Sequence, residues 1–246
     1  MPHSPASTHT RAVADSAALP LPQPTTAVIL DLDGTITDSA PAITTSIAEA
    51  LAACGYRVPD AGTLLRFVGP PIREGFLTFG GVPEPALDGV VAEYRERYRP
   101  RMTQVPLYPG VAQLIETWHA AGIPLALATA KLGELARPIL ADAGLEQFFT
   151  SIHGATREDS HDLPGVQVKA NVVAAALQGL REAEVDVSGA VMVGDRHHDI
   201  EGAAMHGVPG VLAAWGYAQA GEEAGSAAIA EDAAGLARIL GLPQAR

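Results

Sequence analysis

Two aspartates, Asp31 and Asp33, follow directly after the apolar run "AVIL" at residues 27–30. If the chain is extended there, side chains two residues apart point to the same side, so both carboxylates share one crevice. A second acidic pair, Asp195 and Asp199, lies in "GDRHHDI" after the apolar run "AVMV". Like charges about 5 Å apart repel by roughly 3 kcal/mol per pair at an effective dielectric of about 20. Four converging carboxylates therefore need a cation, and ligands that are all oxygen atoms predict a hard ion such as Mg²⁺.

Two alternatives apply to these acidic residues. Asp33-Gly34 is also a strong β-hairpin signal, and that interpretation has even weight when the motif is taken alone. His197 and His198 lie inside the second acidic pair and raise the question of zinc. The side chains of adjacent residues on a helix point about 100° apart, so the two imidazoles are not expected to coordinate one ion. We expect the two histidines to face solvent or to contact the residues that hold the ion rather than the ion itself.

Lysine is rare in this chain, since Lys131 and Lys169 are the two lysines among 16 basic residues. A compact ammonium used where arginine is the usual cation suggests a chemical requirement, because the two side chains are not interchangeable in a tight site. The pattern favours a functional place for Lys169, whereas Lys131 is expected to be a solvated surface residue.

Three apolar runs predict the strands that would position these side chains. The runs lie at residues 27–30, 124–128 and 190–193, lack polar alternation, and are each followed by polar residues and a helical pattern. Such runs suit a parallel sheet that is covered on both faces. We therefore predict an α/β fold with a doubly wound parallel sheet, in which ligands bind at the carboxyl ends of the strands.

A long segment between the first two runs has helical periodicity and no comparable strand run. Its apolar residues recur at spacings of three and four, as in Ile43, Ile47, Leu51 and Cys54, and again in Val90, Val91, Tyr94 and Tyr98. We predict a small helical cap inserted into the α/β core. The expected organisation is a mobile N-terminal extension (1–24), a core (25–40 and 105–246) and a cap (41–104).

Composition excludes several classes of protein. Hydrophobic residues make up 48% of the 246 residues and charged residues 18%, which is typical of a globular protein. The net charge of −12 argues against binding to a nucleic-acid polymer or an anionic membrane surface. The stretch "YRERYRPR" is better interpreted as a solvated helix face than as a nucleic-acid surface.

The expected environment is a reducing one. The chain has a single cysteine, Cys54, which excludes an intramolecular disulfide, and no apolar run approaches the length of a membrane-spanning helix. We expect a cytoplasmic protein without a membrane partner, as a monomer or homodimer. Neither a P-loop motif nor a dinucleotide fingerprint is present in the sequence.

Four ordered motifs resemble those of the haloacid-dehalogenase-like hydrolase superfamily. They are "DLDGT" at 31–35, Thr129 after an apolar strand, Lys169, and "GDRHHD" at 194–199. The helical insertion after the first motif is similar to the small cap domain of that superfamily. The resemblance implies a Rossmann-like core and Mg²⁺-dependent hydrolysis of a small phosphorylated metabolite.

The resemblance also implies roles for the acidic residues. Asp31 would be the nucleophile that forms an aspartyl-phosphate. Asp33 would protonate the leaving oxygen and then activate water. Mg²⁺ would be held by the Asp31 carboxylate, the Asp33 backbone carbonyl and Asp195, with Asp199 supporting this shell.

The phosphoryl oxygens would be held by a further set of groups under the same resemblance. These are Gly34, Thr129, the backbone N–H of Ala130, and Lys169. The sequence departs from the common pattern at two points: Ala130 stands where a small polar residue is frequent, and Ala170 stands where proline is frequent.

Asp33 makes the chain resemble phosphatases more than dehalogenases, because expelling a halide needs no protonation of a leaving alcohol. The stretches "RFVGPPIREGF" and "GDRHHDI" are most similar to phosphoglycolate-phosphatase-like and bacterial 5′-nucleotidase-like members. Phosphoglycolate or a nucleoside 5′-monophosphate is therefore the expected kind of substrate. A phosphosugar mutase of the same fold and a non-catalytic metabolite-binding protein are the alternatives.

Selection among substrates is expected to come from the cap. Within it, Gly69-Pro70-Pro71 predicts a stiff turn that presents Arg73 to the organic part of the substrate, where a guanidinium favours a carboxylate or a second phosphate. A solvated Arg73 without a role is the equal alternative.

Overall fold

The computed structural model describes residues 18–245, so the first 17 residues of the predicted N-terminal extension lie outside the described range. Six parallel strands form one sheet with the order β3-β2-β1-β4-β5-β6. Because the strand order runs outward in both directions from β1, the sheet is doubly wound, and the predicted fold class is confirmed. The strands are β1 (Ala27–Leu30), β2 (Leu125–Leu132), β3 (Ser151–Ala155), β4 (Ala190–Gly194), β5 (Gly210–Ala213) and β6 (Ala228–Ala230).

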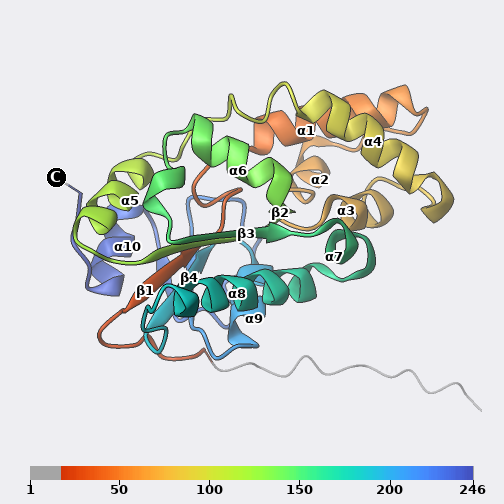
Figure 1. Ribbon diagram of the computed structural model, residues 1–246. Helices are drawn as coiled ribbons and strands as arrows, with labels where there is room; N and C mark the ends of the chain where they lie inside the picture. The colour runs from red at the N-terminus through yellow and green to blue at the C-terminus, as the bar shows by residue number, and fades with distance from the viewer. Residues whose placement is uncertain (1–17, 246) are drawn as a thin grey trace, which may run out of the picture.

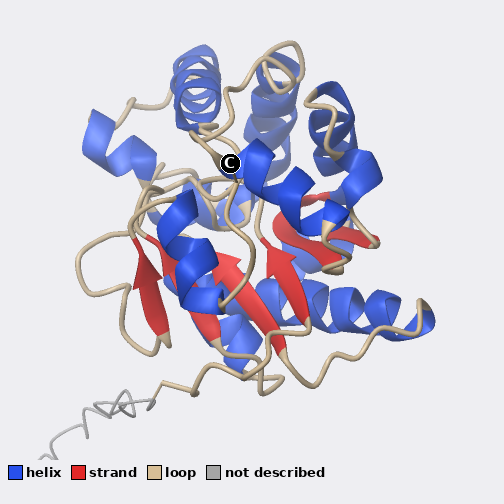
Figure 2. Cartoon of the chain, turned by 90° about the vertical axis from the view of Figure 1, so that its left-hand side faces the viewer, coloured by secondary structure: helices blue, strands red, loops and turns tan. Residues whose placement is uncertain are grey.

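Helices cover both faces of the sheet (Figures 1 and 2). Successive residues of β1 point to opposite faces, so Val28 and Leu30 pack against α5, α6 and α10, while Ala27 and Ile29 pack against α8 and α9. All four side chains are at most 2% exposed, which explains why β1 is apolar throughout. The helices of the α/β core are α5 (Val111–Ala120), α6 (Gly133–Asp142), η2 (Glu146–Phe148), α7 (Arg157–Asp162), α8 (Gly165–Glu182), α9 (His197–Ala204) and α10 (Ala233–Leu240).

A separate group of helices, which we call the helical segment, spans residues 40–98. Its buried residues form a hydrophobic cluster of their own, with Phe67 against Phe76 edge to face at 5.5 Å and Tyr94 stacked on Tyr98 at 5.5 Å. In Figure 2 the arrowheads of the strands point toward these helices. The helices are α1 (Ala40–Ala53), α2 (Ala61–Leu65), α3 (Ile72–Thr78), η1 (Glu84–Ala86) and α4 (Leu87–Tyr98).

The predicted helical stripes mark the buried faces of α1 and α4. Pro41 lies in the first turn of α1, where its missing N–H costs no hydrogen bond, and Gly55 follows the helix with a φ of +78°. Cys54 is an exception, because it caps α1 and is exposed rather than buried. The role of the helical segment as a cap, and the boundaries predicted for it, stay predictions.

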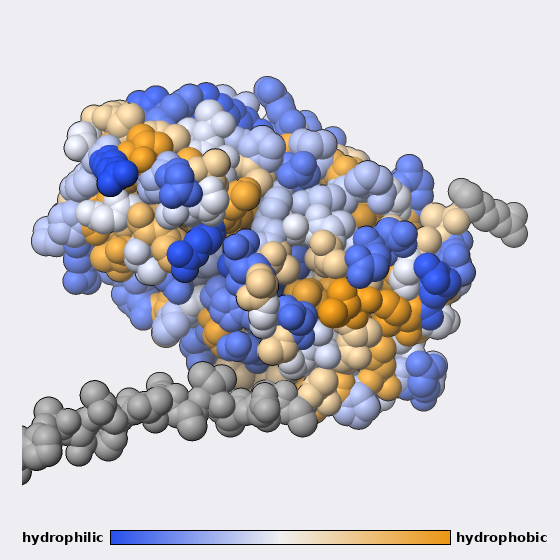
Figure 3. All heavy atoms as spheres, turned by 180° about the vertical axis from the view of Figure 1, so that it is seen from behind, coloured by the Kyte–Doolittle hydropathy of each residue, from blue (hydrophilic) through white to orange (hydrophobic). Residues whose placement is uncertain are grey.

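The surface is mixed in character. On the face shown in Figure 3, hydrophilic residues lie between smaller apolar areas. Large apolar side chains with substantial exposure are scattered along the described chain, as at Leu77 (47%) and Met205 (56%). Across residues 18–245, every helix is too short or too polar to cross a lipid bilayer.

Candidate active site

The carboxyl ends of the two central strands bring three aspartates together. Leu30 of β1 is in register with Val193 of β4, so Asp31 and Asp195 leave neighbouring strands within one residue of each other. Asp199 joins them from the first turn of α9. A carboxylate oxygen from each of these three buried residues lies within 4.8 Å of the others. The sequence predicted that four carboxylates would converge here, and the structure brings three of them together while Asp33 lies outside the group.

Lys169 lies between two of these carboxylates. Its Nζ atom is 2.8 Å from Asp31 Oδ1 and 2.6 Å from Asp199 Oδ1, and it donates a hydrogen bond to the backbone carbonyl of Ala128 at 2.9 Å. The side chain is 2% exposed and comes from α8. Burial alone would lower the pKa of Lys169, but Asp199 and Asp31 raise it further than burial lowers it. Lys169 is therefore a permanent positive charge in the site.

One lysine does not offset three carboxylates. Burial raises the pKa of Asp31 to about 6, against the opposing effect of Lys169 and with a further contribution from Asp199. Burial, followed by the charges of Asp199 and Asp31, also raises the pKa of Asp195 well above its ordinary value. Asp195 Oδ1 is buried and has no hydrogen-bond partner among the described residues. An orphaned carboxylate oxygen beside two further carboxylates fits a hard divalent cation.

Asp33 lies apart from this acidic group. Its Oδ2 atom is 2.9 Å from Lys131 Nζ, and both side chains are less than 10% exposed. Asp33 Oδ1 is buried without a hydrogen-bond partner among residues 18–245. The two aspartates that follow β1 therefore have different partners, Lys169 for Asp31 and Lys131 for Asp33. Asp33 still contributes to the raised pKa of Asp31, but each of the two carboxylates has a lysine beside it that offsets its charge.

The hairpin interpretation of Asp33-Gly34 is wrong. Both neighbours of β1 in the sheet run parallel to it, so no strand returns directly after this turn. Instead, the backbone N–H groups of Ile36 and Thr37 donate to the carbonyl of Leu32 at 2.9 Å and close a tight loop. The turn signal was correct, but the turn serves to end β1 at the site.

Gly34 lies against Asp195 in a conformation that favours glycine. Its φ is +84°, and a Cβ atom built there would lie 2.1 Å from Asp195 Oδ2. That oxygen cannot move freely, because it accepts a hydrogen bond from the backbone N–H of Tyr217 at 2.7 Å and Asp195 is fully buried. A side chain at position 34 would displace the carboxylate that offers the orphaned oxygen.

We expect Gly34→Ala to weaken divalent-cation binding as well as folding. Backbone strain alone costs about 1–2 kcal/mol, and Gly55→Ala is the matched control because its φ is +78° with no atom within 4 Å of the added Cβ. Urea unfolding should show the strain in both variants, with a larger loss for Gly34→Ala. The increase in melting temperature on adding Mg²⁺ should shrink in Gly34→Ala only. Equal behaviour of the two variants would contradict the close contact with Asp195.

The residues predicted to hold phosphoryl oxygens line the same edge. Thr129 is 1% exposed and its hydroxyl accepts a hydrogen bond from the backbone N–H of Lys131 at 3.3 Å. Strand β2 runs past Thr129 to Leu132, so Ala130 and Lys131 belong to the strand. Ala130 lines a pocket with Asp33. The structure places these groups at the site, and their contacts with phosphate stay predictions.

Lys131 is not the surface residue that we expected. Its side chain is 7% exposed, and besides pairing with Asp33 it donates a hydrogen bond to the Tyr98 hydroxyl at 3.0 Å. Burial would lower the pKa of Lys131, but Asp33 and the two tyrosines of α4, Tyr98 and Tyr94, raise it. The contact joins the core to the helical segment. Its partners lie 98 and 33 positions away in the chain, which is why the sequence did not reveal them.

The two histidines lie together and do not diverge. Helix α9 begins at His197, and the rings of His197 and His198 are 3.8 Å apart between centroids. His197 Nδ1 lies 3.0 Å from Glu222, and this contact raises the pKa of His197. Burial lowers the pKa of His198 to about 4, so that ring is neutral near pH 7 and does not face solvent. Neither ring belongs to the metal-competent group found among the described residues.

Arg196 is a site residue that sequence reasoning missed. Its Nε and Nη2 atoms donate to the two oxygens of Glu222 at 2.7 and 2.9 Å, and Nη1 donates to the backbone carbonyl of Val68. The residue is 5% exposed, and it connects the loop between Asp195 and Asp199 to the helical segment. The sequence feature that could have revealed Arg196 is its position between Asp195 and Asp199, the two aspartates already assigned to the site.

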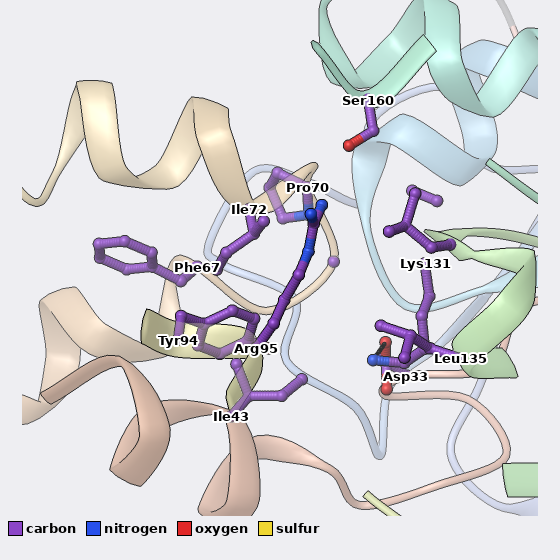
Figure 4. Close-up of a pocket in the computed structure, with 13 residues that line it drawn as sticks. Asp33, Ile43, Phe67, Pro70, Ile72, Tyr94, Arg95, Lys131, Leu135 and Ser160 are labelled. Atoms are coloured by element: carbon purple, nitrogen blue, oxygen red, sulfur yellow. Dashed lines mark ion pairs between the residues drawn. The ribbon is translucent and has the colours of Figure 1, made fainter. Parts of the chain in front are cut away.

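A pocket beside Asp33 lies between the core and the helical segment (Figure 4). The structure does not bring Arg73 into this pocket, because the Arg73 guanidinium pairs with Asp88 and the residue is 8% exposed. Neither alternative for Arg73 therefore describes its environment, which is buried and paired. Arg95, which the sequence assigned to a solvated helix face, lines the pocket instead.

These features define an α/β protein whose candidate site lies at the carboxyl edge of a doubly wound sheet and is built around buried carboxylates and two lysines, Lys169 and Lys131. The chain belongs to the haloacid dehalogenase-like hydrolase family, whose sequence profile matches residues 28–213. The resemblance noted in the sequence is thereby confirmed.

Similar proteins carry several activities in their names. The chain is 41% identical over 194 residues to the Mycobacterium tuberculosis tyrosine-protein kinase PtkA, covering 78% of this chain and 63% of that protein. It is 31% identical over 192 residues to a Pseudomonas aeruginosa 5′-nucleotidase (77% and 83% covered). It is 33% identical over 196 residues to a Rhodobacter capsulatus phosphoglycolate phosphatase (78% and 85% covered).

A solved structure supports the same grouping. A predicted phosphatase from Clostridium acetobutylicum aligns with a TM-score of 0.78 at 28% identity, covering 89% of this chain and 99% of that one. The chain thus spans nearly all of this structure but about 63% of the length of the mycobacterial protein.

Proposed function

We propose that the protein is a Mg²⁺-dependent phosphomonoester hydrolase that acts through an aspartyl-phosphate on Asp31. The observation that carries the proposal is the separation of the two aspartates after β1. Asp31 lies in the buried group with Lys169, whereas Asp33 pairs with Lys131 and lines the adjacent pocket. This arrangement supports a nucleophilic role for Asp31 beside a cation and a role for Asp33 in exchanging protons with the leaving group.

The proposed reaction has two steps. In the first, an Asp31 oxygen attacks phosphorus, the bond between phosphorus and the ester oxygen breaks, and Asp33 gives its proton to the departing alcohol. In the second, Asp33 takes a proton from water while the water oxygen attacks phosphorus, which releases inorganic phosphate and restores the Asp31 carboxylate. Lys169, Thr129 and the N–H of Ala130 hold the phosphoryl oxygens in both steps.

The cation fits the residues that are present. The Asp31 carboxylate, the Asp33 backbone carbonyl and Asp195 would hold Mg²⁺, with Asp199 orienting this shell. When bound, Mg²⁺ offsets the charge of the carboxylates and of the phosphoryl oxygens. The orphaned Asp195 Oδ1 supports this assignment.

The helical segment is proposed to act as the cap. Phe67, Tyr94 and Arg95 from this segment line the pocket that also contains Asp33 and Lys131. A substrate in this pocket would contact the core through its phosphoryl group and the helical segment through its organic part. Closure over the substrate would exclude water from the first step.

The first test is hydrolysis of p-nitrophenyl phosphate. We expect turnover with Mg²⁺, loss of activity in excess chelator, and recovery when Mg²⁺ is restored. Circular dichroism in chelator checks that the protein stays folded. Activity that survives complete chelation, or no hydrolysis across a broad panel that includes phosphoglycolate and nucleoside 5′-monophosphates, would refute the proposal. A phosphosugar mutase would instead give an isomeric phosphosugar without free phosphate.

The similarity to PtkA favours a second candidate, phosphoryl transfer to a tyrosine hydroxyl. The 41% identity to that protein exceeds the identity to the 5′-nucleotidase and to the phosphoglycolate phosphatase. In this reaction Asp31 would take the γ-phosphoryl group of ATP, with ADP as the leaving group. A tyrosine oxygen would then replace water as the acceptor while Asp33 takes the tyrosine proton. Incubation with γ-³²P-labelled ATP separates the candidates. Label on tyrosine of an added protein supports transfer, whereas label found only in inorganic phosphate supports hydrolysis.

A further inference from the structure

The pocket beside Asp33 has polar groups at two ends and apolar side chains between them. Asp33 and Lys131 lie on the core side, and Figure 4 shows Arg95 and Ser160 away from them across the pocket. Both Arg95 and Ser160 also line a neighbouring groove that contains Arg73, Arg157 and His161. The apolar side chains between the two ends include Ile43, Phe67, Ile72, Tyr94 and Leu135.

Arg95 combines partial burial with the lack of an ion pair among residues 18–245, whereas Arg66 and Arg99, which also have no ion pair there, are exposed. Arg73 pairs with Asp88, Arg97 with Glu93, and Arg157 with Glu134. Within residues 18–245, the Arg95 guanidinium has neither a carboxylate within 4.0 Å nor a side-chain hydrogen bond. Burial, and then the nearby charge of Arg157, lower its pKa, so its own environment disfavours the charge. A half-buried, unpaired guanidinium in a chain of net charge −12 is suited to a ligand anion.

Ser160 offers a second polar group at the same end. The residue lies in α7 and is 6% exposed. Its hydroxyl has no hydrogen-bond partner in the described part of the chain, and in Figure 4 it points toward the pocket. A hydroxyl and a guanidinium that both lack a partner among the described residues can together bind one carboxylate or phosphate group.

From these observations we infer that Arg95 and Ser160 form a second anion-binding subsite, and that the substrate is a phosphomonoester whose apolar middle carries a second anionic group. This inference rests on the proposed function, which places the transferred phosphoryl group at Asp31. The inference gives Arg95 of α4 the role that the sequence suggested for Arg73, which is to bind a carboxylate or a second phosphate of the substrate. A small polar phosphoester such as phosphoglycolate would leave the apolar walls of the pocket uncovered.

The test compares 4-carboxyphenyl phosphate with phenyl phosphate, which differ only in the second anionic group. We expect the wild-type protein to prefer the carboxylated ester, and Arg95→Gln to lower its kcat/KM by roughly 10- to 100-fold, with a loss at least tenfold smaller for phenyl phosphate. Ser160→Ala should act in the same direction with a smaller effect. A third ester, 1,4-phenylene bisphosphate, shows whether a carboxylate or a phosphate suits the subsite better.

Arg99→Gln is the matched control. Arg99 lies one helical turn after Arg95, is exposed, and lines neither the pocket nor the groove. It should leave the preference between the two esters unchanged. Charge reversal adds a further check, because Arg95→Glu should shift the preference toward 4-(aminomethyl)phenyl phosphate.

The outcomes separate this inference from the proposed function. One contrary outcome is that the wild-type protein hydrolyses both esters while Arg95→Gln lowers kcat/KM equally for the two, or leaves both values unchanged. Either result overturns the subsite while the proposed function stands. If neither ester is hydrolysed with Mg²⁺, the proposed function fails, and the subsite is judged by calorimetric binding of 4-carboxyphenyl phosphate. Equal affinities of the wild-type protein and Arg95→Gln would then overturn the subsite as well.

Discussion

Asp31→Asn is expected to lower kcat for p-nitrophenyl phosphate on the order of 10⁴-fold or more, because an amide cannot form the covalent intermediate. The fold should persist, since the substitution is isosteric and removes one negative charge from a buried group of three carboxylates that repel one another. Burial already raises the pKa of Asp31 to about 6. We therefore expect Asp31→Asn to be at least as stable as the wild-type protein in chelator, which urea unfolding can measure.

Asp33→Asn is the matched comparison, since it changes the other carboxylate after β1 in the same way. Its kcat should fall by roughly 10²- to 10⁴-fold, as expected when a general acid–base group is lost. Nitrophenolate is a stable leaving group, so the second step should suffer more than the first. Acid quenching with ³²P-labelled substrate should then trap phosphate on Asp31 in Asp33→Asn and none in Asp31→Asn. Similar residual rates and similar labelling in the two variants would contradict the assigned roles.

The sequence revealed the central part of the fold because that part is the most regular. The runs at β1, β2 and β4 are buried on both faces, and each run ends in polar residues. Strands β3, β5 and β6 were not predicted. They are the outer strands of the sheet, have three to five residues each, and contain glycine and alanine with little β-propensity.

The acidic group was predictable for a related reason. Parallel strands end at one edge, and β1 and β4 are neighbours in the sheet, so the residues that follow these two strands lie close together. The partners of Asp33 were not predictable in this way. Lys131 depends on β2 continuing past Thr129, and Tyr98 depends on how the helical segment lies over the sheet.

The pocket could not be predicted for the same reason, because its lining depends on how distant elements pack against one another. Helical periodicity identified Tyr94 and Tyr98 as buried, but periodicity describes one helix and says nothing about what lies opposite. Arg95, next to the buried stripe, was therefore grouped with the solvated arginines. Arg73 was considered for a role in the site because a stiff turn precedes it, with a solvated Arg73 as the equal alternative, whereas its actual partner, Asp88, lies on a different helix.

Lys169→Met is expected to destabilise the protein strongly and to abolish most of its activity. The ammonium is the one protein cation in direct contact with Asp31 and Asp199 among the described residues, at 2.8 and 2.6 Å. Breaking a buried ion pair from one side costs about 3–5 kcal/mol, because the remaining charge is left uncompensated. Without Lys169, Asp31 would bind a proton more readily, and a protonated carboxyl group is a poor nucleophile. We expect kcat to fall by more than about 100-fold.

The free energy of unfolding should be measured in urea, first in chelator and then with Mg²⁺. Under the proposed function Mg²⁺ binds the folded state, so it should restore part of the lost stability, while activity should stay low because the proposed contact of Lys169 with the phosphoryl group is missing. Arg181→Met is the matched control, because Arg181 is an exposed residue of the same helix and should change stability by less than about 0.5 kcal/mol. If Lys169→Met unfolds like the wild-type protein in chelator, the carboxylates do not depend on this ammonium. The positive charge that holds them together would then have to come from the cation alone.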